Sequence, residues 1–193
     1  PLDALAPERP LFLWRVDGHT AWLNRAGLRR AGIGPDTRDP KGGRIVRDES
    51  GRATGVLLEK AAERVWTEVV PSPSTAAKTA GLRAAQQRAV ERGITSVQDH
   101  LGDPACYRRL EAQGDLRVRA SLWGDLFRPL EELETLRREL GTRPGAPLRF
   151  GLLKGFLDGT IGSRTAWLSE RYPGADEGRG LPLRERGEVV ERV

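Results

Sequence analysis

Apolar and polar positions alternate along the second half of the chain in blocks that predict helices and strands in turn. Helices that alternate with short strands favour a parallel sheet with helical crossovers. This alternation leaves a doubly wound sheet and a (β/α)8 barrel both open, but no G-x-G-x-x-G motif follows a strand, so the dinucleotide-binding fold loses its usual support. The predicted helices are 74–92, 103–113 and 129–140, and the predicted strands are 94–99, 116–123 and 148–156.

The first part of the chain contains more loops. Its predicted elements are a strand at 11–16, a helix at 21–31, a β-hairpin at 42–57 and a helix at 58–69. Trp22, Leu23 and Leu28 are the expected apolar stripe of the first helix, and Glu49-Ser50-Gly51 is the expected hairpin turn. A Pro-Ser break follows, so we divide the chain into a loop- and hairpin-rich subdomain, 1–73, and an α/β part, 74–193.

The three predicted strands of the α/β part end in polar or aromatic groups. In a barrel, functional residues lie at the carboxyl ends of the strands. Those ends are Gln98-Asp99-His100, Trp123-Gly124-Asp125 and Lys154-Gly155.

Lys154 is the most informative of these residues. The apolar run Phe150 to Leu153 predicts a buried strand that ends in this single lysine, and a polar loop with three glycines follows. This pattern is typical of a strand that delivers a cation, or a modified lysine, into a site. From the spacing alone, a lysine paired with Asp158 or Asp99 is the favoured interpretation.

The net charge and the distribution of arginine indicate which classes of partner the chain binds. The net charge is +5 and the sequence pI about 10, with only four lysines, so the excess is almost entirely arginine. The arginines are dispersed or occur in isolated pairs with acidic neighbours, as on a solvated helix face, whereas nucleic-acid-binding surfaces cluster basic residues among aromatics. We therefore expect no nucleic-acid partner.

The cysteine content and the lengths of the apolar runs bear on the cellular location of the protein. The single cysteine, Cys106, rules out an internal disulfide and is expected to be a packing residue. No apolar run is long enough for a membrane span and no signal peptide is visible. We expect a cytoplasmic protein without membrane contact, and a signal peptide in an N-terminal segment ahead of residue 1 stays open. The chain lacks Met, even at position 1, and stops inside a helix-like run, so we interpret it as a fragment of a longer protein.

Several segments resemble one known family. Residues 154–166, KGFLDGTIGSRTA, resemble the KxFxDGxxGSRTA signature of the YtcJ-like branch, family 3, of the metal-dependent amidohydrolases. Residues 15–24, RVDGHTAWLN, resemble its RVDGHxAWxN segment. Three more segments resemble parts of this family: DPKGG (residues 39–43) and TGVL (54–57) around the predicted hairpin, and the strand GITSVQD (93–99). All of these segments occur in the same order as in the family. The resemblance covers nearly the whole chain.

The resemblance implies that the chain is part of a (β/α)8 barrel whose strands two, three and four are the three predicted strands, with 1–73 inserted ahead of them. It implies a hydrolase of carbon–nitrogen bonds in small non-peptide amides or cyclic amides, with one or two divalent metal ions, expected to be zinc. The lysine that ends strand four is often carboxylated by CO2 in this superfamily and bridges the metal ions. Lys154 is therefore expected to be a metal ligand, as a carbamate.

The same resemblance implies that the remaining metal ligands and the catalytic aspartate lie outside this chain, so no catalytic residue is expected within it. His100 matches no ligand position. The expected substrate-binding residues are His19, Asp158, Arg164 and Trp123. Arg164 is a natural anchor for a carboxylate or carbonyl, and Trp123 is a candidate apolar wall.

Two further expectations follow. One ligand cannot complete a metal site, so the 193-residue chain alone is expected to be inactive as a hydrolase, and the unpaired strand edges of a partial barrel predict association, including a homo-oligomer. The rival interpretation is a non-catalytic basic α/β binding module with an anion site at Lys154 and Arg164.

Overall fold

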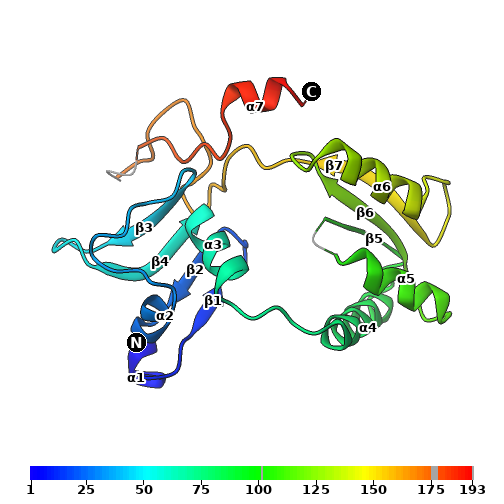
Figure 1. Cartoon of the computed structure of the whole chain (residues 1–193), viewed down its shortest axis with the longest axis horizontal. Helices are drawn as coiled ribbons and strands as arrows, with labels where there is room; N and C mark the ends of the chain where they lie inside the picture. Colours follow the sequence, from blue (N-terminus) through cyan, green and yellow to red (C-terminus); the bar gives the residue numbers. More distant parts are fainter. Residues whose placement is uncertain (101, 175–177, 193) are drawn as a thin grey trace. The chain divides into compact units, whose positions relative to one another are not determined.

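The computed structural model describes residues 1–100, 102–174 and 178–192, and it divides into two compact units (Figure 1). Unit 1 comprises Pro1–Ser72 and Phe156–Glu191, and unit 2 comprises Pro73–Gly155. Each unit has its own sheet and its own core. The domain division expected from the sequence concerns the whole protein and stays a prediction. In this chain, residues 156–191 belong with the first unit by their contacts.

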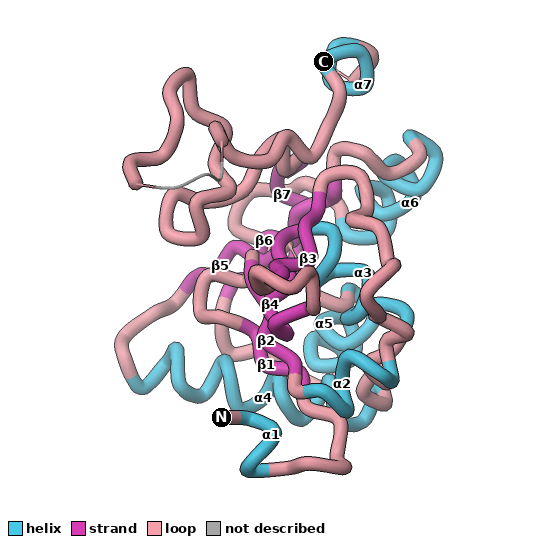
Figure 2. Tube along the Cα trace, turned by 90° about the vertical axis from the view of Figure 1, so that its left-hand side faces the viewer, coloured by secondary structure: helices cyan, strands magenta, loops and turns pink. Residues whose placement is uncertain are grey.

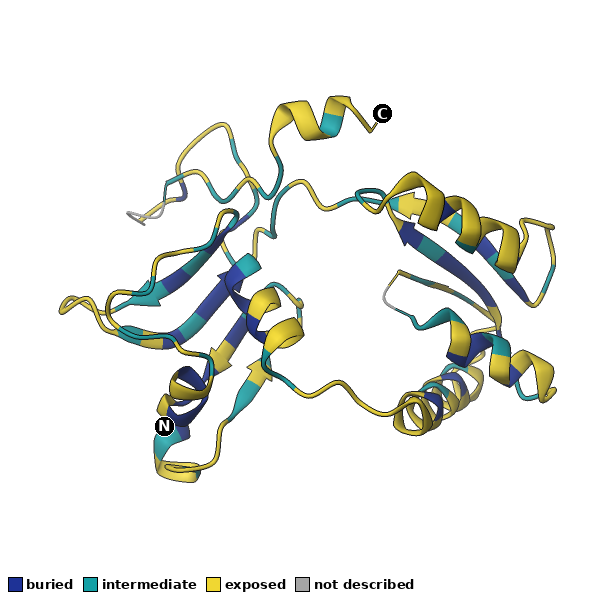
Figure 3. Cartoon of the chain, viewed as in Figure 1, coloured by how far each residue is buried: buried dark blue, intermediate teal, exposed yellow. Residues whose placement is uncertain are grey.

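Unit 1 is built on a four-stranded antiparallel sheet with the strand order β1-β2-β4-β3. The strands are β1 (Phe12–Trp14), β2 (Thr20–Leu23), β3 (Gly43–Arg47) and β4 (Ala53–Glu59). The predicted hairpin is confirmed, because β3 and β4 pair and the Asp48 carboxylate accepts backbone hydrogen bonds from Ser50 and Arg52 across the turn. The core of the unit lies between this sheet and helices α2 (Arg25–Arg30) and α3 (Lys60–Glu68), and it includes the fully buried Leu57. Figure 3 shows the buried positions along the chain.

The helix predicted over residues 21–31 begins later than expected. Residues 20–23 form β2, and helix α2 is Arg25–Arg30. Asn24 is its N-cap, since its side-chain oxygen accepts hydrogen bonds from Gly27 N (2.8 Å) and Leu11 N (2.9 Å). Trp22 is exposed while Leu23 is buried, which is the period-two pattern of a strand. The predicted apolar stripe across these two residues was therefore wrong.

Helix α3, Lys60–Glu68, follows β4 directly, and the chain changes direction at Glu59. The predicted helix is confirmed, except that its first two residues belong to β4. Glu59 has φ 51° and ψ −122°, a conformation that residues with a side chain rarely adopt.

A long loop connects strand β7 (Leu148–Lys154) to helix α7 (Arg186–Val190) (Figure 2). The described part of residues 155–185 contains neither helix nor strand. Leu183 N donates to Leu157 O at 2.9 Å within the loop, and Lys41 pairs with Glu185 of the loop at 3.2 Å. A short helix, α1 (Leu2–Leu5), begins the chain.

Unit 2 is a three-stranded parallel sheet with the order β5-β6-β7. Its helices are α4 (Thr75–Glu91), α5 (Pro104–Ala112) and α6 (Leu130–Leu140), and its strands are β5 (Ser96–Asp99), β6 (Arg119–Asp125) and β7 (Leu148–Lys154). The predicted alternation of helix and strand is confirmed, with Ser74 as the N-cap of α4. The fold class of the chain is thus mixed α/β. No helix in the described part of the chain combines the length and the apolar character that crossing a bilayer requires.

The two faces of the unit 2 sheet differ. Ala120, Leu122, Leu148 and Phe150 form the buried face and pack with side chains of α5 and α6. Strand β7 was expected to be buried as far as Leu153, and this was wrong: Leu152 and Leu153 are 61% and 46% exposed. Among the residues that the structure describes, β7 pairs with β6 alone, so the end of the strand is less covered.

Substitution of two glycines of the hairpin distinguishes the cost of backbone strain from the cost of steric overlap. Gly51 and Gly55 both have positive φ, but a Cβ on Gly51 would meet nothing within 4 Å, whereas one on Gly55 would lie 2.2 Å from Leu23 O. We expect Gly51→Ala to cost about 1–2 kcal/mol from strain alone and Gly55→Ala to cost about 1–3 kcal/mol more from overpacking. Thermal melting of the two full-length variants checks this, and equal melting temperatures would contradict it.

Candidate active site

The signature loop, residues 158–166, closes on itself through its backbone. Arg164 N donates to Ile161 O, and Thr165 N donates to Thr160 O, both at 3.0 Å. Arg164 has φ 55° at this turn. The Thr165 side chain is fully buried, whereas Arg164 is exposed. The loop is therefore a compact turn with Thr165 inside it and Arg164 on its surface.

The loop is docked onto the segment around Asp17, which lies about 146 positions away in the sequence. Ser163 Oγ donates to Asp17 Oδ2 at 2.6 Å and also lies 2.9 Å from Thr20 Oγ1. Arg15 Nη1 donates to Gly162 O at 2.7 Å and to Ser163 Oγ at 3.0 Å. Two of the segments that carried the family resemblance thus contact each other in unit 1.

Asp17 is stabilised as a carboxylate by these contacts. Burial alone would raise its pKa, but the hydrogen bonds from Ser163 Oγ and His19 N and the charge of Arg15 outweigh burial and lower the pKa. A lowered pKa in the folded state stabilises the fold above the unfolded-state value of about 4 and loses that effect as the pH falls through the folded-state pKa. The docking of the loop is therefore at full strength near neutral pH.

A second set of contacts links His19, Glu59 and Thr165. His19 Nδ1 lies 2.8 Å from Glu59 Oε2, and Thr165 Oγ1 donates to Glu59 Oε1 at 2.5 Å. The Glu59 side chain is only 4% exposed and that of His19 16%. A buried carboxylate is costly without partners, and here each oxygen has one. His19 is thus held at the edge of the loop by a residue that sequence reasoning missed.

Glu59 was not expected because the pattern of residues 58–69 placed it inside a helix. Its partners lie 40 and 106 positions away, so no local pattern identifies them. The available signal was an acidic residue directly after the apolar run Val56-Leu57-Leu58. Such a residue at the end of a buried strand requires a partner.

The other predicted substrate-binding residues of unit 1 are not paired with each other. Asp158 Oδ2 accepts a hydrogen bond from Trp167 N at 2.7 Å and so closes the loop. The Arg164 guanidinium forms no hydrogen bond or ion pair with the residues that the structure describes. Asp158 therefore shapes the loop, while Arg164 is available to a ligand.

In unit 2, Lys154 lies at the carboxyl end of β7 and is partly buried, with Asp125 as its register partner on β6. Trp123 lies on the same strand as Asp125, two residues before it, and its indole packs over Gly151. A Cβ at Gly151 would be 2.7 Å from Trp123 Cδ1, so this glycine provides the space for the ring. Lys154 and Trp123 thus lie near the same end of the sheet.

Asp99 lies on the face of the sheet that the helices cover. Its carboxylate accepts hydrogen bonds from Tyr107 Oη at 2.8 Å and from Gly102 N at 2.9 Å. Burial and the hydrogen bond to Asp99 raise the pKa of Tyr107. Asp99 is paired with Leu122 in the register, a residue of the buried face, so its side chain is directed to α5.

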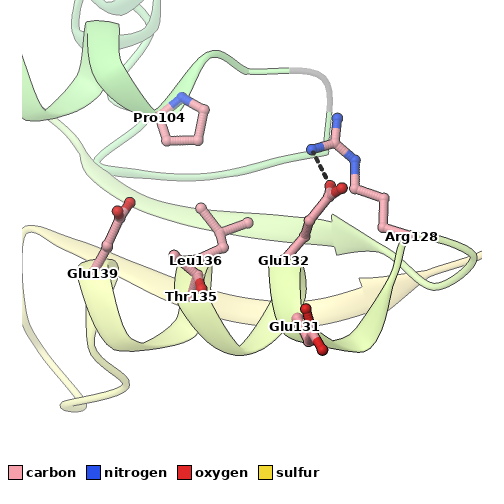
Figure 4. A pocket seen from close by; sticks show the side chains of 7 residues that line it. All are labelled: Pro104, Arg128, Glu131, Glu132, Thr135, Leu136 and Glu139. Carbon is pink, nitrogen blue, oxygen red and sulfur yellow. Dashed lines mark ion pairs between the residues drawn. The ribbon is translucent and has the colours of Figure 1, made fainter.

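A complete metal site is not assembled from residues 1–100, 102–174 and 178–192, where no three His, Cys, Asp or Glu side chains are placed to hold an ion. Unit 2 does have an open depression of about 430 Å³ beside α6 (Figure 4). Acidic side chains line much of it, and Arg128 pairs there with Glu132 at 3.8 Å. Its lining residues are Pro104, Arg128, Glu131, Glu132, Thr135, Leu136 and Glu139.

Comparison with known proteins shows the family to which the chain belongs. The whole chain, residues 1–193, matches the Amidohydrolase family. The chain therefore belongs to the amidohydrolase family, and the resemblance seen in its sequence motifs is confirmed.

Individual relatives support this family membership. The chain is 32% identical to YtcJ of Bacillus subtilis (strain 168), an amidohydrolase by name, over 95% of this chain and 35% of that protein. It is 32% identical to the N-substituted formamide deformylase of Arthrobacter pascens, over 81% of this chain and 31% of that protein. A solved metal-dependent hydrolase of Pyrococcus horikoshii OT3, itself uncharacterized, superposes with a TM-score of 0.62 at 25% identity, over 98% of this chain and 37% of that one. The chain thus spans about a third of the length of its relatives.

Gly159 is required for the contact between Glu59 and Thr165. A Cβ at Gly159 would lie 2.1 Å from both Glu59 Oε1 and Thr165 Oγ1, whereas one at Gly162 would meet nothing closer than 3.6 Å. We expect Gly159→Ala to displace the loop at a cost of about 1–3 kcal/mol and Gly162→Ala to be tolerated. Hydrogen exchange of the loop amides in the full-length variants checks this. Equal protection in both variants would show that the space at Gly159 is not needed.

Proposed function

We propose that this chain is part of a metal-dependent hydrolase that cleaves carbon–nitrogen bonds of small non-peptide amides or cyclic amides. Membership of the amidohydrolase family supports the reaction class. The name of the Arthrobacter relative, a deformylase of N-substituted formamides, supports the carbon–nitrogen bond as the target. The activity is that of the whole protein, of which these residues form a part.

The observation that carries the proposal is the position of Lys154. Strands β5, β6 and β7 are parallel, lie side by side in sequence order and are joined by helices, as consecutive strands of a (β/α)8 barrel are. We assign them to strands two, three and four of such a barrel, with 1–73 as an inserted subdomain. Lys154 then ends strand four at the edge where barrel enzymes have their active sites.

The chemistry of Lys154 suits a metal ligand only after modification. A protonated lysine has three donors and no acceptor, so it cannot bind a cation. A neutral lysine amine can add CO2 with release of a proton to form a carbamate. The carbamate is an anion with two oxygens, which is the donor type that divalent cations accept.

In this proposal, the described residues supply one ligand of the metal site, Lys154. Protein metal sites use three or more ligands, and in this proposal the remaining ligands are histidines outside residues 1–193, where the catalytic aspartate also lies. A bound divalent ion, zinc in this proposal, supplies Lewis acidity toward the scissile carbonyl and toward water.

The substrate-binding roles belong to four residues. Arg164 is exposed without a described partner and offers five donors to a carbonyl or carboxylate. His19 lies at the edge of the loop through Glu59, and Asp158 shapes the loop through Trp167 N. Trp123 offers an apolar surface beside Gly151.

Replacement of Lys154 tests the metal role. In the full-length protein, Lys154→Ala is expected to lower bound metal and to reduce hydrolysis of N-substituted formamides by at least about a hundredfold, since even an outer partner of a metal ligand is worth about 10–100-fold. Added short-chain carboxylates are expected to restore part of the activity by replacing the carbamate. Metal content by mass spectrometry and steady-state kinetics measure both effects.

Lys78→Ala is the matched control, because Lys78 is an exposed lysine on α4 that pairs with Asp103. It is expected to keep wild-type metal content and activity. If Lys154→Ala also keeps both, the ligand role is wrong. Loss of binding of a small anion such as phosphate, with metal content unchanged, would instead favour the anion-binding module.

A further inference from the structure

The hydrogen bonds around Glu59 have fixed directions. Thr165 Oγ1 lies 2.5 Å from Glu59 Oε1 and 3.4 Å from Thr160 O, so we assign its proton to the much shorter contact with Glu59, and it accepts from Thr160 N at 3.0 Å. An ionised carboxylate only accepts hydrogen bonds. The partner of the other oxygen must then be a donor, and that partner is His19 Nδ1. The proton of the neutral His19 ring is therefore on Nδ1.

This assignment leaves Nε2 of His19 as an acceptor, because a neutral imidazole has one donor and one acceptor nitrogen. Nε2 forms no hydrogen bond with the described residues, and it is not among the buried polar atoms that lack a partner there. With a side chain that is 16% exposed, His19 presents Nε2 to solvent or to a ligand.

The ring is held in place from several sides. Phe156 packs edge-on against His19, with the ring centroids 5.8 Å apart and the planes at 72°. The backbone N of His19 donates to Asp17 Oδ1 at 3.1 Å. Glu59 itself has a backbone conformation that favours glycine, and strained residues of this kind cluster at functional sites. The side chain of Glu59 is thus retained at a conformational cost.

We propose that Glu59 is a positioning residue that keeps His19 in the Nδ1–H tautomer, so that His19 Nε2 accepts a hydrogen bond from the N–H of the substrate amide. The substrates are then amides that carry an N–H, in preference to fully N-substituted ones. This inference rests on the proposed function, because it takes the substrate to be an amide.

The tautomer is measured directly in the wild-type full-length protein. Nitrogen-15 NMR of histidine-labelled protein at about pH 8.5, above the ordinary histidine pKa of about 6.5, distinguishes a protonated from an unprotonated ring nitrogen. His19→Asn identifies the signals by their disappearance. We expect Nε2 to be unprotonated. A protonated Nε2 in the neutral ring would overturn the proposal.

Glu59→Gln changes the tautomer with little change in size. Its oxygen accepts the hydrogen bond from Thr165, so its NH2 donates to His19 Nδ1 and moves the ring proton to Nε2. For N-butylformamide, kcat/KM is expected to fall roughly tenfold, the size of one hydrogen bond. For N-methyl-N-butylformamide, which has no N–H, it is expected to change by less than about twofold.

Glu63→Gln is the matched control, because Glu63 is an exposed residue of α3 that pairs with Lys60, and wild-type rates are expected for both formamides. Equal losses for both substrates in Glu59→Gln, with an unchanged tautomer, would reduce Glu59 to a structural role and overturn the proposal. If Glu59→Gln does not fold, the wild-type tautomer and the wild-type preference between the two formamides decide. If the wild-type protein hydrolyses neither compound, the proposed function is wrong for this substrate class, while NMR still tests the role of Glu59.

Discussion

The burial of the Glu59 carboxylate is the constraint on which the architecture of unit 1 depends. An ionised group that is almost inaccessible to water is stable only with hydrogen-bond donors on both oxygens, and His19 and Thr165 supply them. These donors come from segments far apart in the sequence. One carboxylate thus joins the sheet, the segment around Asp17 and the signature loop, and it fixes the position of the loop.

Unit 2 is organised by its parallel sheet rather than by a buried carboxylate. Its parallel strands end in a row at one edge, and the register places Asp125 beside Lys154 there. The helices bury one face of the sheet. The lysine of the proposed metal site lies in unit 2, and the histidine that a carboxylate orients lies in unit 1.

The sequence predicted the regular parts of the fold well because they depend on local periodicity. The helices and strands of unit 2, the hairpin and the location of Lys154 were all readable from nearby residues. Strand β2 was missed because Ala21-Trp22-Leu23 continues into the apolar positions of α2, and pairing with β1 and β4 decides its structure. Glu59 was missed for a related reason, since its partners are set by tertiary packing.

The central claim is that Lys154 is a metal ligand in the full-length amidohydrolase. The most direct test is a crystal structure of that protein prepared with zinc and bicarbonate, with anomalous scattering data collected at the zinc edge. The account predicts a carbamate on Lys154 with a zinc ion about 2.0–2.2 Å from one of its oxygens. An unmodified lysine with no metal beside it, under the same conditions, would contradict the account.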